Sequence, residues 1–142
     1  MGRRPLSGRD AGALILSYLI VVPVFMLAVM VIVQSALWYL AREAALAAAR
    51  QGVDAARVPG ATAAAGPQAA LAFVRNSASG YLLGAAASMT GPQAGAGPGA
   101  TPTIQITVTG HIPTFVPGLV INISQAVQAP AEKFVAPKAA AP

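Results

Sequence analysis

Few residues of this sequence could carry out chemistry. The chain has a single histidine, His111, no cysteine, and four scattered acidic residues. A zinc site needs several ligands close together, and acid–base catalysis by carboxylates needs a pair of them. The sequence also lacks a Gly-x-Ser-x-Gly nucleophile motif and a glycine-rich phosphate loop. We therefore expect no catalytic residues, no metal and no cofactor, and we do not expect an enzyme.

A different pattern lies near the N-terminus, where Gly12 separates a charged segment from a long apolar run. Arg3, Arg4 and Arg9 precede this glycine. Ala13-Leu14-Ile15-Leu16 follow it, and Ser17 and Tyr18 come next. What this spacing means depends on the elements around it.

The apolar run is long enough to cross a membrane. No charged residue occurs between Ala11 and Ala41, and sixteen Leu, Ile, Val or Phe residues lie between Leu14 and Leu40. A bilayer span takes about 20 apolar residues. Insertion of these side chains gains on the order of 5–10 kcal/mol before the polar residues and Pro23 are counted against it. The sequence therefore predicts a transmembrane helix over 13–41, which Pro23 should kink or loosen.

Two export signals are alternatives to a membrane anchor. A secretory signal peptide has an apolar region of about 7–15 residues and a small-x-small cleavage site. The run here is about twice that length and ends in aromatic residues, Trp38 and Tyr39, that suit a membrane interface. The pair Arg3-Arg4 matches a twin-arginine signal only weakly.

The basic residues favour a topology more than a nucleic-acid partner. The chain carries nine Lys and Arg against four Asp and Glu, for a net charge of +5, but these residues form no downstream cluster. Lysine and arginine are equally frequent on both sides of the apolar run within twenty residues. The short N-terminal segment with its closer charges favours a cytoplasmic N-terminus and an extracytoplasmic head.

The helix should continue beyond the membrane over 42–58. This stretch is rich in helix formers and stops at Val58-Pro59-Gly60. A small-residue face at four-residue spacing would let another helix approach closely. Alanine-rich composition alone would produce the same pattern, and the spacing does not decide between the two explanations. The face comprises Ala44, Ala48, Gly52 and Ala56.

The remaining residues predict a small α+β head. Residues 59–102 read as a linker, a short helix from Pro67 that Gly80 interrupts, and a flexible loop. Alternating apolar residues then indicate a β-hairpin over 103–128 with prolines in its connection. A third strand in 81–90 remains open. The tail, 129–142, is expected to be partly disordered.

With these residues laid out, the sequence resembles the TadE-like family, the minor pilins or pseudopilins of tight-adherence (Flp-type) type IV pilus systems, in its actinobacterial form. The family pattern is a basic leader, glycine, four mostly apolar residues, glutamate and an aromatic residue, often with a proline six residues after the glutamate. Here Gly12, Tyr18 and Pro23 match, but Ser17 stands in place of the glutamate. The Ala-Arg stretch after the membrane and the C-terminal strand, Pro-Gly turn, strand and Pro-x-Glu-x-Phe also resemble the family.

The resemblance implies a pilin-like protein whose leader, 1–12, is cut between Gly12 and Ala13 by a membrane-bound prepilin peptidase. It also implies packing with other pilin-like subunits and inner-membrane platform proteins, and possible entry into a cell-surface pilus. In the family the glutamate is thought to attract a neighbour's N-terminal amine, and a serine cannot neutralise that charge. We therefore expect a minor component. The alternative is an unprocessed single-pass envelope protein that acts as a structural adaptor in a secretion or pilus assembly complex.

Overall fold

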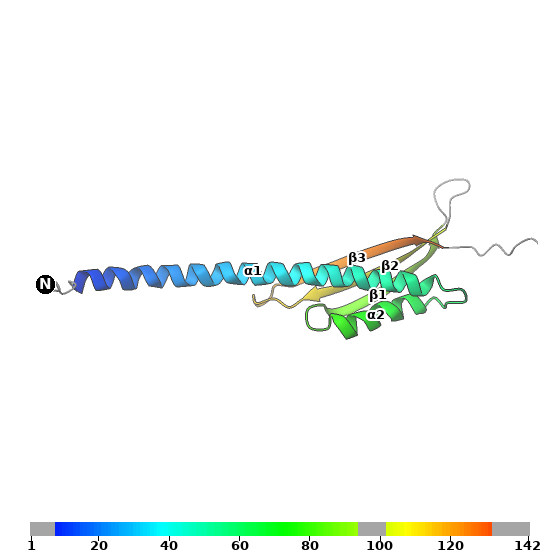
Figure 1. Ribbon diagram of the computed structural model, residues 1–142, viewed down its shortest axis with the longest axis horizontal. Helices are drawn as coiled ribbons and strands as arrows, with labels where there is room; N and C mark the ends of the chain where they lie inside the picture. Colours follow the sequence, from blue (N-terminus) through cyan, green and yellow to red (C-terminus); the bar gives the residue numbers. More distant parts are fainter. Residues whose placement is uncertain (1–7, 94–101, 132–142) are drawn as a thin grey trace, which may run out of the picture. The chain divides into compact units, whose positions relative to one another are not determined.

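The computed structural model describes residues 8–93 and 102–131, with side chains over 18–91 and 102–131. The chain divides into two compact units at Ala36 and Leu37. We call the described part of the first unit, residues 8–36, the stem, and the described part of the second, from residue 37, the head. The elements are α1 (Gly8–Ala56), α2 (Ala65–Ser77), β1 (Leu83–Gln93), β2 (Thr103–Ile112) and β3 (Ile121–Pro130) (Figure 1).

One long helix, a short helix and a three-stranded antiparallel sheet make this an α+β protein, as the sequence predicts. The stem consists of the first part of α1, and the head contains the rest of α1 and the other elements. The 49 residues of α1 form a single helix that begins at Gly8 and ends at Ala56, just before the predicted stop at Val58-Pro59.

The sheet has the order β1-β2-β3, with both pairs antiparallel. The predicted hairpin is therefore present as β2 and β3, but it is two thirds of a larger sheet. Residues 83–93 form the third strand, β1, which overlaps the 81–90 segment left open as a strand. The other expectation, a helix interrupted at Gly80 and then a loop from 90, is wrong over 83–93. Alanine has the highest helix propensity of the amino acids, but intrinsic propensity is a small effect that tertiary contacts override, and here the neighbouring strand β2 offers backbone hydrogen bonds to this segment.

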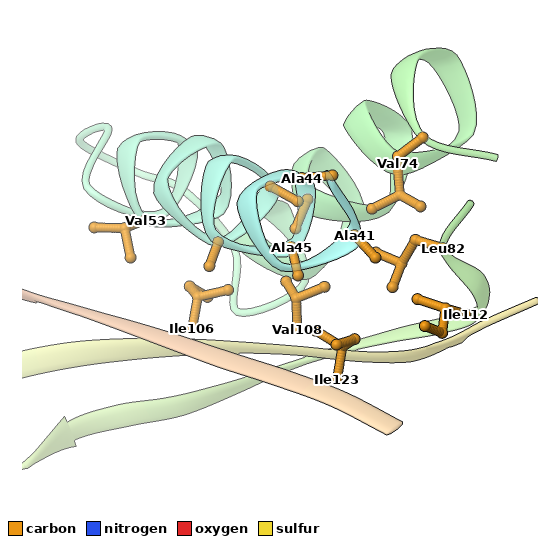
Figure 2. Close-up of a cluster of buried hydrophobic side chains, with 14 residues drawn as sticks. Ala41, Ala44, Ala45, Val53, Val74, Leu82, Ile106, Val108, Ile112 and Ile123 are labelled. Atoms are coloured by element: carbon orange, nitrogen blue, oxygen red, sulfur yellow. The ribbon is translucent and has the colours of Figure 1, made fainter. Parts of the chain in front are cut away.

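The hydrophobic core of the head lies between the inner face of the sheet and the two helices. Ile106, Val108 and Ile112 of β2 and Ile123 of β3 point toward α1 (Figure 2). The facing side of α1 is made of small, buried residues, with Val53 at its far end. Because methyl groups are short, the helix backbone can lie close to the larger sheet side chains. The buried alanines of α1 are Ala41, Ala44, Ala45, Ala48 and Ala49.

The helix α2 packs beside α1 through its own buried stripe of Gly66, Ala70 and Val74. It then leads through Ala78 and Leu82, both buried, into β1. At the end of α2, the hydroxyl of Tyr81 donates a hydrogen bond to the carbonyl oxygen of Ser77, at 2.9 Å. Together these contacts fix α2 over the β1 side of the sheet.

Candidate functional site

The described part of α1 carries the longest run of exposed large apolar side chains in the structure. All the side chains from Tyr18 to Val29 are exposed, among them Phe25 and Met26 at 63% and 62%. Within the described residues, one helix is long and apolar enough to cross a membrane, the 39-residue stretch Tyr18–Ala56, whose most apolar window has a mean hydropathy of 2.6. A soluble protein rarely exposes so large a contiguous apolar surface. This surface needs a cover of lipid or of other helices.

The predicted processing site lies within α1. The backbone at Gly12, Ala13 and Ser17 is helical, and the side chains of residues 8–17 fall outside those that the structure describes. The aromatic residue of the motif, Tyr18, is 68% exposed. The leader residues 1–7 lie outside the described residues. The structure therefore gives the backbone setting of this motif and leaves its recognition by a peptidase as a prediction.

Pro23 and Ser35 each interrupt the apolar character of the stem, in different ways. The helix is continuous through Pro23, although proline has no N–H to donate to the carbonyl four residues earlier. Ser35 is satisfied within the helix, since its Oγ donates to the carbonyl oxygen of Val31 at 2.7 Å. A serine bonded in this way is compatible with an apolar environment.

The predicted small-residue face lies against the head's own elements. Ala44, Ala48 and Gly52 are buried and Ala56 is half-buried. A Cβ placed on Gly52 would lie 2.9 Å from the carbonyl oxygen of Gly66 in α2. The helix that approaches this face therefore belongs to the same chain. The spacing in the sequence predicted a close helix contact but contained no sign that Gly66 would provide it.

His111 lies in β2 near its end and is half-buried. A Cβ placed on Gly84 of β1 would meet the imidazole at 2.8 Å, so the ring lies directly against that glycine. Among the described residues, no group of three or more His, Cys, Asp or Glu side chains could hold a metal ion. The environment of His111 is thus a packing contact between two strands.

The charged residues of the described head lie on its helices, except for Arg57 in the turn that follows α1. Arg42, Glu43, Arg50 and Asp54 are exposed on α1, and Arg75 is exposed at the end of α2. The guanidinium of Arg42 lies 5.8 Å from the centroid of the Trp38 ring, a cation–π distance. In contrast, the sequence from residue 76 to residue 131 has no Asp, Glu, Lys or Arg, so the whole described sheet is free of these charges.

A scan against protein-family models and searches of the curated proteins and of the solved structures found no match to this chain.

Proposed function

We propose that this chain is a minor pilin or pseudopilin of a tight-adherence type IV pilus assembly system, and not an enzyme. The observation that supports the proposal most directly is the course of α1. Its first part exposes apolar side chains, and its last part forms the core of a small α+β head. A single helix shared in this way between a membrane and a folded head is what a pilin-like subunit requires. The spacing of Gly12, Tyr18 and Pro23 in the sequence adds to this support.

In the proposed role, a prepilin peptidase cuts the chain after Gly12 on the cytoplasmic side. The new N-terminus is the amine of Ala13, and the head stands outside the cytoplasm. The stem then packs with pilin-like subunits and inner-membrane platform proteins. Ser17 offers a hydroxyl in place of a carboxylate, so it cannot neutralise the amine of a neighbouring subunit. This difference favours an accessory place in the assembly over that of the repeated shaft subunit.

In the head, one side of α1 already packs against α2 and the sheet of the same chain. The small residues around Gly52 contact α2 and β2 of the same chain. Packing between subunits therefore falls to the stem and to the outward side of α1, where Arg50 and Asp54 are exposed. This division assigns one side of α1 to folding and the rest of its surface to assembly.

The test is the N-terminal residue of the protein recovered from native envelopes, determined by intact mass and N-terminal peptide mapping. We expect a chain that begins at Ala13. A Gly12→Val variant should keep its leader, because the peptidase reads a glycine at the cut. A Gly8→Val variant is the matched control and should be cut like the wild type.

A wild-type chain that still carries residues 1–12 would overturn the pilin proposal. The serine at position 17, which departs from the family pattern, would then favour the adaptor function. In that function the same stem anchors an unprocessed single-pass protein, and the head binds components of a secretion or pilus assembly complex.

A further inference from the structure

The connection between β2 and β3, residues 113–120, is unusually apolar for a surface loop. Phe115, Val116, Leu119 and Val120 are 58%, 50%, 47% and 62% exposed. Loops ordinarily carry polar residues because they run through water. Four large apolar side chains together on one exposed loop indicate a surface that another apolar phase covers. We call residues 113–120 the apolar loop.

The apolar loop has a fixed shape. The N–H of Leu119 donates to the carbonyl oxygen of Val116 at 3.2 Å, around Pro117 and Gly118. Gly118 has a φ of +83°, so these four residues form a type II turn with proline and glycine in their preferred places. The hydroxyl of Thr114 donates to the carbonyl oxygen of Leu119 at 2.6 Å. Backbone groups that enter a lipid phase need such internal partners, and prolines have no N–H that needs one.

The apolar loop lies at the Leu37 end of the head. Figure 2 shows Ile106 near Val53 and Ile112 on the side of Ala41, so β2 runs opposite to α1. Ile106 lies under Gly52, within 3.0 Å of a Cβ placed there. Six residues of strand advance about 20 Å. On a helix that distance covers about 13 residues, which places Ile112 level with Tyr39.

The exposed large apolar residues of the head gather at this same end. Besides the apolar loop, they include Leu83, which pairs with His111 at the start of β1. Trp38, Tyr39 and Leu40 add to them on α1. Of the exposed large apolar residues in the described head, Val58 alone lies toward the other end, beyond the end of α1. Figure 1 shows the yellow β2–β3 connection and the green α2–β1 connection side by side at this end of the head.

A membrane surface suits this end of the head better than a protein partner does. Trp38 and Tyr39 are the aromatic residues that gather at membrane interfaces, and they follow directly on the apolar stem. Arg42 lies over the Trp38 ring, and Arg75 lines one hollow with Leu83. With the exposed acid Glu43 beside Arg42, the charged rim formed by these three residues is positive by one charge. Such a rim fits anionic headgroups, while the apolar loop fits the acyl boundary below them.

We propose that the apolar loop inserts into the membrane interface beside α1, so that the head lies against the bilayer through a second point of contact. The inference rests on the insertion of the stem that the proposed function includes, but it does not require cleavage or assembly. It predicts that Phe115 and Val120 lie among the first methylenes of the lipid chains. The head is then held against the membrane until the subunit leaves it.

The test uses tryptophan as a depth probe, because the chain has a single native tryptophan, Trp38. Three full-length proteins are reconstituted in phosphatidylcholine–phosphatidylglycerol vesicles: the wild type, Trp38→Phe with Phe115→Trp, and Trp38→Phe with Val58→Trp. Phe115 and Val58 are both 58% exposed, so they form a matched pair at the two ends of the head. Lipids brominated on the upper acyl chain quench a tryptophan that touches them, and aqueous iodide quenches one in water.

We expect the brominated lipids to quench Trp38 of the wild type and the tryptophan at position 115, and iodide to quench the tryptophan at position 58. Quenching of Trp38 without quenching at 115 would overturn the loop proposal and leave the membrane stem intact. A blue-shifted emission at 115 that neither bromine nor iodide quenches would also overturn it, because the loop would then be buried against protein. Failure to quench Trp38 would overturn the insertion of the stem and the loop proposal together.

Discussion

Gly52 of α1 and Gly66 of α2 contact each other so closely that neither position has room for a side chain. A Cβ on Gly52 would lie 2.9 Å from the Gly66 carbonyl oxygen, and a Cβ on Gly66 would lie 3.0 Å from the Gly52 carbonyl oxygen. Ile106 fills the space beneath both, at 3.0 and 2.8 Å from the same two positions. The two helices and the central strand therefore meet at one point.

Gly52→Ala should destabilise the head, against the usual effect of this substitution in a helix. In an unhindered helix, glycine to alanine gains about 1 kcal/mol. Here the added methyl group would press on the backbone of α2, and overpacking of this kind costs roughly 1–3 kcal/mol. We expect a net loss in the free energy of unfolding, measured by circular dichroism on the full-length protein in detergent micelles.

Gly80→Ala is the control for this experiment. A Cβ on Gly80 meets nothing within 4 Å. The free energy of unfolding of the Gly80→Ala protein should differ from that of the wild type by no more than about 0.5 kcal/mol. A Gly52→Ala protein that is more stable than the wild type would contradict the close approach of the two helices.

Gly84→Ala should destabilise the head for two separable reasons. Gly84 has a φ of +58°, and an alanine in that conformation costs about 1–2 kcal/mol. The new Cβ would also lie 2.8 Å from the imidazole of His111. In a His111→Ala background only the first cost remains, so Gly84→Ala should be less harmful there. A double-mutant cycle of unfolding free energies measures the difference.

Gly118→Ala measures the cost of placing alanine at a positive φ by itself. Gly118 has a φ of +83°, and nothing lies within 4 Å of an added Cβ. Its cost should be the same with and without His111. If the loss of unfolding free energy in Gly84→Ala is also the same with and without His111→Ala, the ring does not lie against the glycine.

Ile106→Ala should cost more stability than any other single truncation in β2. Ile106 is fully buried and contacts both helices. Truncation of a buried isoleucine to alanine costs about 2–5 kcal/mol, because it removes apolar contacts and leaves a cavity. Ile104→Ala, two residues earlier on the same face but only half-buried, is the matched comparison. Equal losses of unfolding free energy in the two variants would contradict the central place of Ile106.

Ser17→Glu should increase the share of this chain that enters filaments, if the proposed pilin function holds. A carboxylate at position 17 restores a partner for a neighbour's amine, although placing it within an apolar helix costs about 2.5–3.5 kcal/mol unless it is paired. The measurement is the ratio of this chain to the major subunit in purified filaments, by quantitative mass spectrometry. Ser17→Gln is the control, because glutamine has the size of glutamate without its charge, and it should leave the ratio unchanged. An equal rise in both variants would argue against charge pairing.

The long helix and the hairpin could be predicted because their patterns have strong contrast. The uncharged run Ala11–Ala41, 31 residues long, admits few structures other than a membrane-length helix. In β2, Ile106 and Val108 alternate with Thr107 and Thr109, so the two faces of the strand differ clearly. The observed bounds follow these patterns closely, with β3 starting at Ile121 and extending to Pro130.

The strand β1 lacked such contrast. Its inward residues include Ala85 and Ala87, and its outward residues include Ala86. With alanine on both faces, the sequence shows no alternation of apolar and polar residues, and its composition favours helix. The pairing with β2 decides the structure, and that pairing depends on residues far away in the sequence. The contact of Gly52 with Gly66 was hidden for the same reason.

The sheet that lacks Asp, Glu, Lys and Arg has a consequence for how the head responds to ionic strength. Contacts between exposed charges weaken as added salt screens them. Any contact made through the outer face or the edges of β1 and β3 would use hydroxyl, amide and methyl groups, and would persist in high salt. Contacts made through Arg50 and Asp54 on α1 would weaken. The salt dependence of an association therefore reports which side of the head makes it.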